Sequence, residues 1–132
     1  MALSQDIVGK RFTYPDHYIV GREKIREYAV AVKNDDEVFF DENAAKELGH
    51  DALPAPLTFI SVFGYYAQRA FFDHANIGIT DAKIVQVDQE FRFLKPIRAG
   101  DKLYCEVSVH SVRQSFGTDI IVTKNIVTNE AG

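Results

Sequence analysis

One short acidic stretch contains residues that could take part in proton transfer. Between Asn34 and Asp41 the chain carries the carboxylates Asp35 and Asp36, with Phe39 two residues before Asp41. A carboxylate paired with a histidine can act as a general base and a general acid at carbon and oxygen. The stretch contains no histidine, so Asp35 and Asp36 are interpreted as solvated loop residues.

The histidines and the single cysteine do not indicate a metal centre or a nucleophile. None of them falls into a metal-ligand spacing, because they lie far apart along the chain: His17, His50, His74, Cys105 and His110. We therefore expect no metal and no cofactor. Cys105 cannot form an internal disulfide and fits a small core residue. His50 and His74 are interpreted as ordinary surface or loop residues.

The bulk composition predicts a single soluble domain. The chain has 132 residues, 46% of them hydrophobic, and a net charge of −4. This acidic balance argues against nucleic acid as a partner, because that binding needs a concentrated positive field. No apolar run approaches the roughly 20 residues of a membrane span, and the N-terminal residues lack the pattern of a secretory signal. A cytoplasmic location without membrane contact is expected.

Helices are predicted in the first half of the chain. Apolar residues recur every three or four positions over 22–33, and Asp41 and Gly49 are suitable caps for a short helix between them. Residues 57–72 are apolar on every side of a helical wheel, which predicts a buried central helix. Gly64 within it is interpreted as a position of close packing.

Strands are predicted at 84–93 and 102–112, where apolar and polar residues alternate, at 119–128, which is rich in β-branched residues, and at 17–20, a short segment closed by Gly21. One long helix with a long antiparallel sheet is an α+β fold in which the sheet wraps around the helix. After 128 the sequence reads as a turn with no further strand. We therefore expect residues 1–132 to form one domain that lacks a final C-terminal strand and leaves a sheet edge to be paired.

Three stretches resemble the MaoC-like dehydratases and hydratases of the hot-dog fold. Residues 91–103 are similar to their strand–turn–strand signature, 53–63 to the entry of their central helix, and 34–41 to their catalytic loop. Over 2–132 the chain resembles the non-catalytic A-type or C-type subunits of mycobacterial (3R)-hydroxyacyl-ACP dehydratases. Those subunits belong to the FAS-II fatty-acid biosynthesis that builds mycolic acid.

The resemblance places the family's catalytic pair at residues that cannot do the chemistry. Aligned on Asp41, the family's histidine falls at Phe39 and its aspartate at Asn34. Dehydration of a β-hydroxy thioester needs a base at the α-carbon and an acid at the departing hydroxyl. Phenylalanine has no transferable proton and a neutral amide is not a useful base. The resemblance thus implies a lyase subunit with no catalytic residue of its own.

The resemblance also implies a substrate channel and an interface. The residues expected along an acyl channel are Phe39, Thr58, Phe59, Val62, Phe63 and Tyr66; the alternative for any one of them is core packing or, for Thr58, a helix cap. Gln86, Asp88 and Glu90 share one strand face, either solvated or in the interface with a partner. The partners implied are a catalytic hot-dog dehydratase subunit and an acyl carrier protein bearing a long acyl chain.

Two other functions remain open on the sequence. The chain could be a homodimeric acyl-thioester binding protein without chemistry. It could also be a catalytic homodimer or a thioesterase that uses Asp35 or Asp36, although the sequence shows no pairing of a nucleophile with a histidine.

Overall fold

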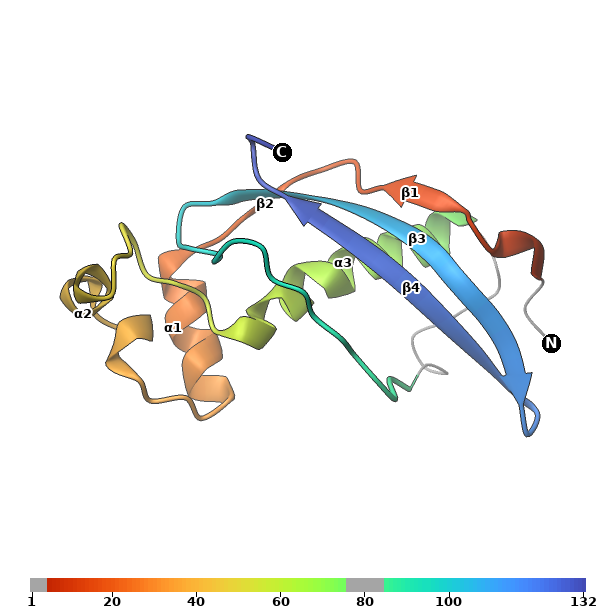
Figure 1. Cartoon of the computed structure of the whole chain (residues 1–132), viewed down its shortest axis with the longest axis horizontal. Helices are drawn as coiled ribbons and strands as arrows, with labels where there is room; N and C mark the ends of the chain where they lie inside the picture. The colour runs from red at the N-terminus through yellow and green to blue at the C-terminus, as the bar shows by residue number, and fades with distance from the viewer. Residues whose placement is uncertain (1–4, 76–84) are drawn as a thin grey trace. The chain divides into compact units, whose positions relative to one another are not determined.

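The computed structural model describes residues 5–75 and 85–132. Within these ranges the contacts divide the chain into two compact units, one of Met1–His17, Gly64–Val85 and Tyr104–Gly132, and one of Tyr18–Phe63 and Gln86–Leu103. In chain order the elements are η1 (Gln5–Ile7), β1 (Arg11–Thr13), β2 (Tyr18–Ile19), α1 (Arg22–Ala31), η2 (Glu37–Phe39), α2 (Glu42–Glu47), η3 (Leu57–Phe59), α3 (Ile60–Ala75), β3 (Lys102–Ser115) and β4 (Thr118–Thr128) (Figure 1).

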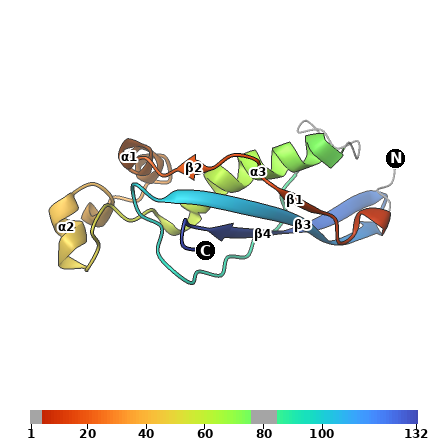
Figure 2. The same cartoon turned by 90° about the horizontal axis from the view of Figure 1, so that it is seen from above.

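The first unit is an antiparallel sheet with a helix on one face. Strand β3 pairs with β4 along almost its whole length and with β1 at Phe12↔Val107. The second half of α3 runs along one face of the β3–β4 hairpin (Figures 1 and 2). The rings of Phe12 and Phe71 are stacked with centroids 5.9 Å apart. The core of this unit consists of Ile7, Ala67, Phe71, Phe72, Cys105, Val107, Val109 and Val112.

The second unit holds the remaining helices. Strand β2 pairs with the start of β3 at Tyr18↔Leu103. Tyr18 stacks on Phe63 with ring centroids 5.4 Å apart, and Tyr28 of α1 meets Phe59 edge to face at the same separation. The core of this unit consists of Val20, Ile25, Ala29, Val38, Ala45, Leu53, Phe59, Phe63 and Leu103. The long helix and the antiparallel strands confirm the α+β class predicted from the sequence.

The short helices form where the sequence predicts them. Helix α1 begins at Arg22, and α2 begins after Asp41, whose carboxylate accepts the N–H of Asn43 at 2.9 Å. Gly49 follows α2 with a φ of +86°, the left-handed conformation that favours glycine at the end of a helix. The capping chemistry was therefore readable from residue types alone.

The strand predicted at 84–93 is not formed by its described residues, 85–93. Val85 and Val87 are each 82% exposed, and no described segment forms a ladder with them. Alternation of apolar residues indicates that a segment could enter a sheet. A strand exists only when a neighbour accepts and donates its backbone hydrogen bonds. Ile84 lies outside the described residues.

The central helix is not buried on all sides, so that prediction was wrong. A buried stripe at every fourth position consists of Phe59, Phe63, Ala67 and Phe71. Away from it, Leu57 is 70% exposed, Tyr65 51% and Tyr66 48%. One face of the η3–α3 segment is thus core, and another presents large apolar side chains to the outside. The helix itself begins at Ile60, three residues later than predicted, after the single turn η3.

Replacing Gly64 with alanine is expected to stabilise the fold. A methyl group there would lie 3.5 Å from the Asn125 side-chain nitrogen, an ordinary van der Waals contact, so the predicted close packing is not required. Alanine in place of a helical glycine is worth about 0.5–1 kcal/mol. Thermal unfolding should show a higher Tm for Gly64→Ala. The control is Gly117→Ala, which should lower the Tm because Gly117 has a φ of +76°; equal shifts for the two variants would contradict the argument.

Candidate functional site

The polar groups of the acidic stretch are used to fold its own backbone. Asn34 Oδ1 accepts the N–H of Asp36 at 3.2 Å, and Asp36 Oδ1 accepts the N–H of Val38 at 3.1 Å. These bonds form consecutive turns between α1 and α2, and the second caps η2. Both side chains therefore have a structural explanation. Asp35 is exposed and Phe39 is half-buried at the end of η2.

Among the described residues, no hydrogen bond or ion pair joins a histidine to Asp35 or Asp36. His17 lies 3.3 Å from the carboxylate of its neighbour Asp16, but both side chains are exposed. The ring of His74 packs against Phe12 with centroids 5.0 Å apart. The combination of carboxylate and histidine that proton transfer requires is thus absent from the described part of this loop.

The contact made by His50 was missed by the sequence analysis. Its Nδ1 accepts a hydrogen bond from Arg98 Nε at 3.0 Å, and both side chains are partly buried. The residues are 48 positions apart, and no local pattern signals such a pair. The two segments are brought together by the bridge Pro54↔Arg98, where Ala55 N–H donates to the Ile97 carbonyl at 2.7 Å and Ala99 N–H to the Leu53 carbonyl at 2.8 Å.

Thr58 does not act as a helix cap. The N-cap of η3 is Pro56, and no side chain caps this turn. Instead Thr58 Oγ1 lies 2.7 Å from the Tyr28 hydroxyl, a hydrogen bond in which either oxygen can be the donor. Two hydroxyls carry two protons, and this bond uses one of them. The pair therefore retains one O–H for a further acceptor.

The residues expected along an acyl channel divide into two groups. Phe59 and Phe63 are 1% exposed and pack against tyrosines in the core. Thr58 and Tyr66 are exposed, and Val62 is half-buried, as Phe39 is. The spacing of Thr58, Val62 and Tyr66 at every fourth residue puts them on one side of the η3–α3 segment. This outward side, rather than the buried one, is accessible to a ligand.

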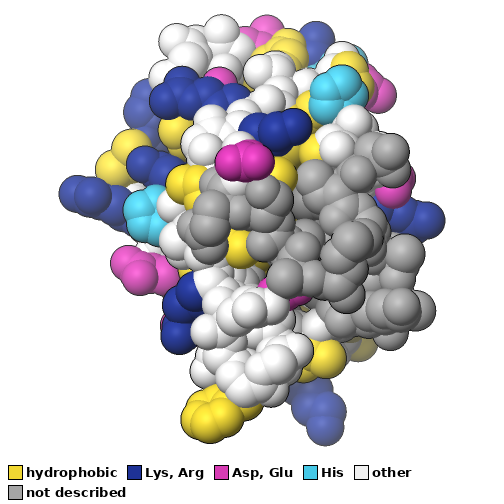
Figure 3. All heavy atoms as spheres, turned by 90° about the vertical axis from the view of Figure 1, so that its right-hand side faces the viewer, with side chains coloured by type: hydrophobic (Ala, Val, Ile, Leu, Met, Phe, Trp, Pro, Cys, Tyr) yellow, Lys and Arg dark blue, Asp and Glu magenta, His cyan; other side chains and the backbone are white. Residues whose placement is uncertain are grey.

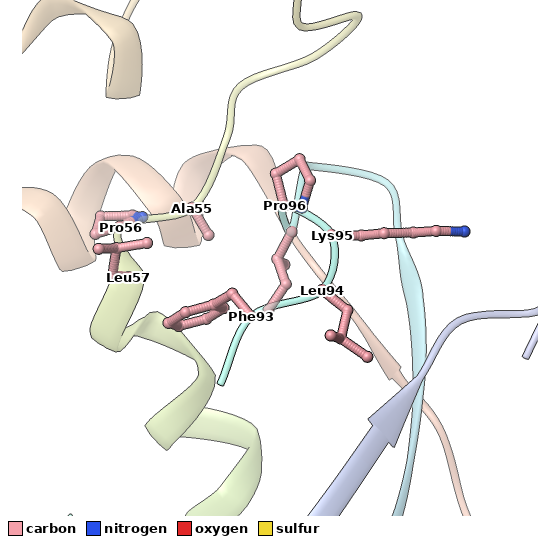
Figure 4. Close-up of a pocket in the computed structure, with 8 residues that line it drawn as sticks. Ala55, Pro56, Leu57, Phe93, Leu94, Lys95 and Pro96 are labelled. Carbon is pink, nitrogen blue, oxygen red and sulfur yellow. The ribbon is translucent and has the colours of Figure 1, made fainter. Parts of the chain in front are cut away.

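A shallow apolar hollow lies beside the start of the helix. It has a volume of about 260 Å³ and is lined by Ala55, Pro56, Leu57, Phe93, Leu94, Lys95, Pro96 and Ile97. Phe93 points toward Pro56 and Leu57, whereas the Lys95 side chain extends away from them (Figure 4). The hollow carries no charged group directed at a ligand. It offers apolar contact but no catalytic chemistry.

The comparisons with known proteins place these features in a family. The model of the FAS1-like dehydratase domain region matches residues 6–132. The UPF0336 protein Rv0635 of Mycobacterium tuberculosis is 69% identical over all 132 residues of this chain, which cover 84% of the relative. The chain belongs to the FAS1-like dehydratase region family.

Solved structures of similar proteins have the same fold as this chain. A chain of the C-terminally truncated HadBC (3R-hydroxyacyl-ACP dehydratase) complex of Mycobacterium tuberculosis is 52% identical, with a TM-score of 0.88, and the match covers 98% of this chain and 91% of that one. A MaoC-like dehydratase is 34% identical, with a TM-score of 0.77, over 97% of this chain and 39% of the other. The MaoC-like hot-dog fold expected from the sequence is confirmed.

The side chains expected at an interface, those of residues 86, 88 and 90, are polar and exposed. Gln86, Asp88 and Glu90 lie in the extended segment before β3, and their neighbour Gln89 accepts a weak hydrogen bond from Ser61 Oγ at 3.4 Å. On the face drawn in Figure 3, basic and acidic side chains are interspersed. Over the described ranges, no three His, Cys, Asp or Glu side chains form a metal-binding group, and no helix is long and apolar enough to cross a membrane.

Cys105 has the environment of a core residue rather than a nucleophile. Its side chain is 2% exposed. Burial, with a smaller contribution from the charge of Glu106, raises the pKa of the thiol to about 11. Since the thiolate is the reactive form, the thiol is inert at neutral pH. The sequence-based interpretation of Cys105 as a small core residue is confirmed.

We expect Cys105 to react with a thiol reagent such as Ellman's reagent only after unfolding.

The burial of Cys105 also predicts a pH effect on stability. The unfolded thiol ionises near its ordinary pKa of 9.0, and the folded thiol at about 11. Stability should thus fall as the pH rises between these values, because only the unfolded state releases the proton there. Urea titrations of wild type and Cys105→Ala test this pH effect, because the loss of stability at alkaline pH should be smaller in the variant. Rapid labelling of the native protein by the thiol reagent would contradict the burial of Cys105.

Proposed function

We propose that the chain is a substrate-binding, non-catalytic subunit of a heterodimeric (3R)-hydroxyacyl-ACP dehydratase that acts in long-chain, mycolic-acid elongation. The observation that carries the proposal is the state of residues 34–41. Asn34 and Asp36 are committed to backbone turns, and Phe39 occupies the position where the family resemblance puts a histidine. The family membership supports the dehydratase chemistry, and the similarity to a chain of the HadBC complex supports a two-chain assembly.

In this proposal the partner subunit provides the proton transfers. A base removes the proton from the α-carbon, an acid protonates the β-hydroxyl, and water leaves as the double bond forms. This chain contributes binding. The side of the η3–α3 segment that carries Thr58, Val62 and Tyr66 receives the acyl chain, and the spare O–H of the Thr58–Tyr28 pair donates to a substrate oxygen.

The proposed contact with the partner is the extended segment before β3. Residues 85–93 have exposed valines and no ladder partner within the described chain. An exposed segment without a ladder partner can add to the sheet of another chain. Gln86, Asp88 and Glu90 alternate along this segment, so they would share one face of the added strand.

The first test is reconstitution. This chain alone should not hydrate or dehydrate acyl thioesters, and it should become active when mixed with a hot-dog subunit that retains the aspartate and histidine. Asp36→Asn separates a role in folding from a role as a base, because asparagine also caps a turn but is not a base. Asp35→Asn and Asp36→Asn in this chain should leave kcat unchanged in the complex. Turnover by this chain alone would exclude the proposal, and tight acyl-thioester binding by an inactive homodimer would favour a binding protein.

The second test concerns the acyl channel. Val62→Trp adds volume to the outward side of α3. Each methylene displaced from an apolar site loses about 0.8 kcal/mol, so excluding three or four costs a long substrate roughly 2–3 kcal/mol. The kcat/KM of the complex should thus fall for long acyl chains and remain nearly constant for short ones.

The matched control for that test is Val30→Trp, the same change at a residue of α1 that is 65% exposed. It should leave the ratio of long-chain to short-chain kcat/KM unchanged. A lower Tm for Val62→Trp with an unchanged ratio would assign Val62 to the core and remove the channel from this helix.

A further inference from the structure

The hydrogen bond between His50 and Arg98 joins the end of α2 to the turn before β3. Arg98 Nε donates to His50 Nδ1 at 3.0 Å. His50 follows α2, and Arg98 belongs to the turn that leads into β3. Because neither residue has a role in the proposed function, the origin and consequence of this contact can be considered separately.

The Arg98 end of the contact is fixed by several hydrogen bonds. The N–H of Arg98 is donated to Asp101 Oδ2 at 2.9 Å. The next two residues donate their N–H groups to the carbonyl oxygens of Leu53 and Val20, each at 2.8 Å. This turn is thus anchored to two other segments of the same unit, and loss of the His50 contact would leave it in place.

On the other side of the contact, His50 follows helix α2, which is too short to be stable by itself. Helix α2 has six residues, of which only Ala45 is buried. Isolated helices of this length are unstable in water, so contacts at its ends must hold it. At its N-terminal end Asp41 caps it and Glu42 accepts a hydrogen bond from Arg22 Nε at 2.8 Å. At its C-terminal end the side-chain contact is the one from His50 to Arg98.

This C-terminal contact requires a neutral imidazole. Nδ1 can accept from Arg98 only while it carries no proton, which leaves the proton on Nε2. A second proton would turn Nδ1 into a donor and place an imidazolium against a guanidinium, which stays charged at every physiological pH. Asp101, which lies on the Arg98 side, is bonded to a backbone N–H, and the charged residues on the His50 side, Lys46, Glu47 and Asp51, are exposed.

We propose that His50 and Arg98 form a proton-sensitive latch that holds the C-terminal end of α2 at neutral pH and releases it when His50 gains a proton. Histidine changes its charge within the range between pH 5 and 8. The contact at the other end of the helix, from Arg22 Nε to Glu42, contains no histidine. Acidification therefore frees residues 43–50 from one end, while the segment before Asp41 keeps its caps.

The test is amide hydrogen exchange of the full chain, compared at about pH 7.5 and about pH 5.5 after correction for intrinsic rates, a range that spans histidine titration. Exchange of residues 43–50 should become about tenfold faster at the lower pH, the factor expected for losing one hydrogen bond. Exchange within α1, residues 22–31, serves as the internal reference and should not change.

Two variants separate the latch from a general effect of acid. His50→Asn keeps an acceptor near the position of Nδ1 but cannot be protonated, so its exchange should be slow at both pH values. Arg98→Met keeps the aliphatic stem and removes the donor, so its exchange should be fast at both. An equal pH response in wild type and His50→Asn would overturn the latch. So would a wild type that shows no response. Nitrogen NMR of the wild-type imidazole provides a further check, because finding the proton on Nδ1 at neutral pH would also overturn it.

Discussion

The constraint on which this structure depends is the hydrogen-bond pairing of strand β3. Each of the other strands described pairs with β3: β1 and β4 with its main part and β2 with its start. Strand β3 also contributes the apolar residues Leu103, Cys105, Val107 and Val109 to the core. A shift of its register by one residue would turn this set outward and expose it. Residues 85–93 form no ladder with β3 or with another described strand, and this segment is therefore not a strand.

Backbone N–H groups also need hydrogen-bond partners in the acidic stretch between α1 and α2, and this explains the role of its side chains. Short turns contain backbone N–H groups that a regular helix would satisfy internally, and here Asn34, Asp36 and Asp41 satisfy them with side-chain oxygens. Of the two candidate bases, Asp36 is thereby used in folding, whereas Asp35 is exposed. The chain belongs to the FAS1-like dehydratase region family, and residues 34–41 contain no histidine.

A single helix serves two environments because its faces differ. The stripe Phe59, Phe63, Ala67 and Phe71 is buried, while Leu57, Tyr65 and Tyr66 remain largely exposed. Exposed large apolar residues on one side of a helix indicate a surface that binds something apolar. The apolar character that the sequence shows all around this helix thus combines two roles, core packing on one side and the proposed substrate contact on the other.

The sequence by itself determined the α+β class, the helix caps at Asp41 and Gly49, and the burial of Cys105, because each follows from the residue type and its neighbours within a few positions. The family resemblance also predicted that Asn34 and Phe39 stand where the family has an aspartate and a histidine. Only the tertiary structure decided which face of α3 is buried, that 85–93 lacks a ladder, and that His50 meets Arg98. These features depend on residues tens of positions apart, and local periodicity contains no information about which segment will supply the partner.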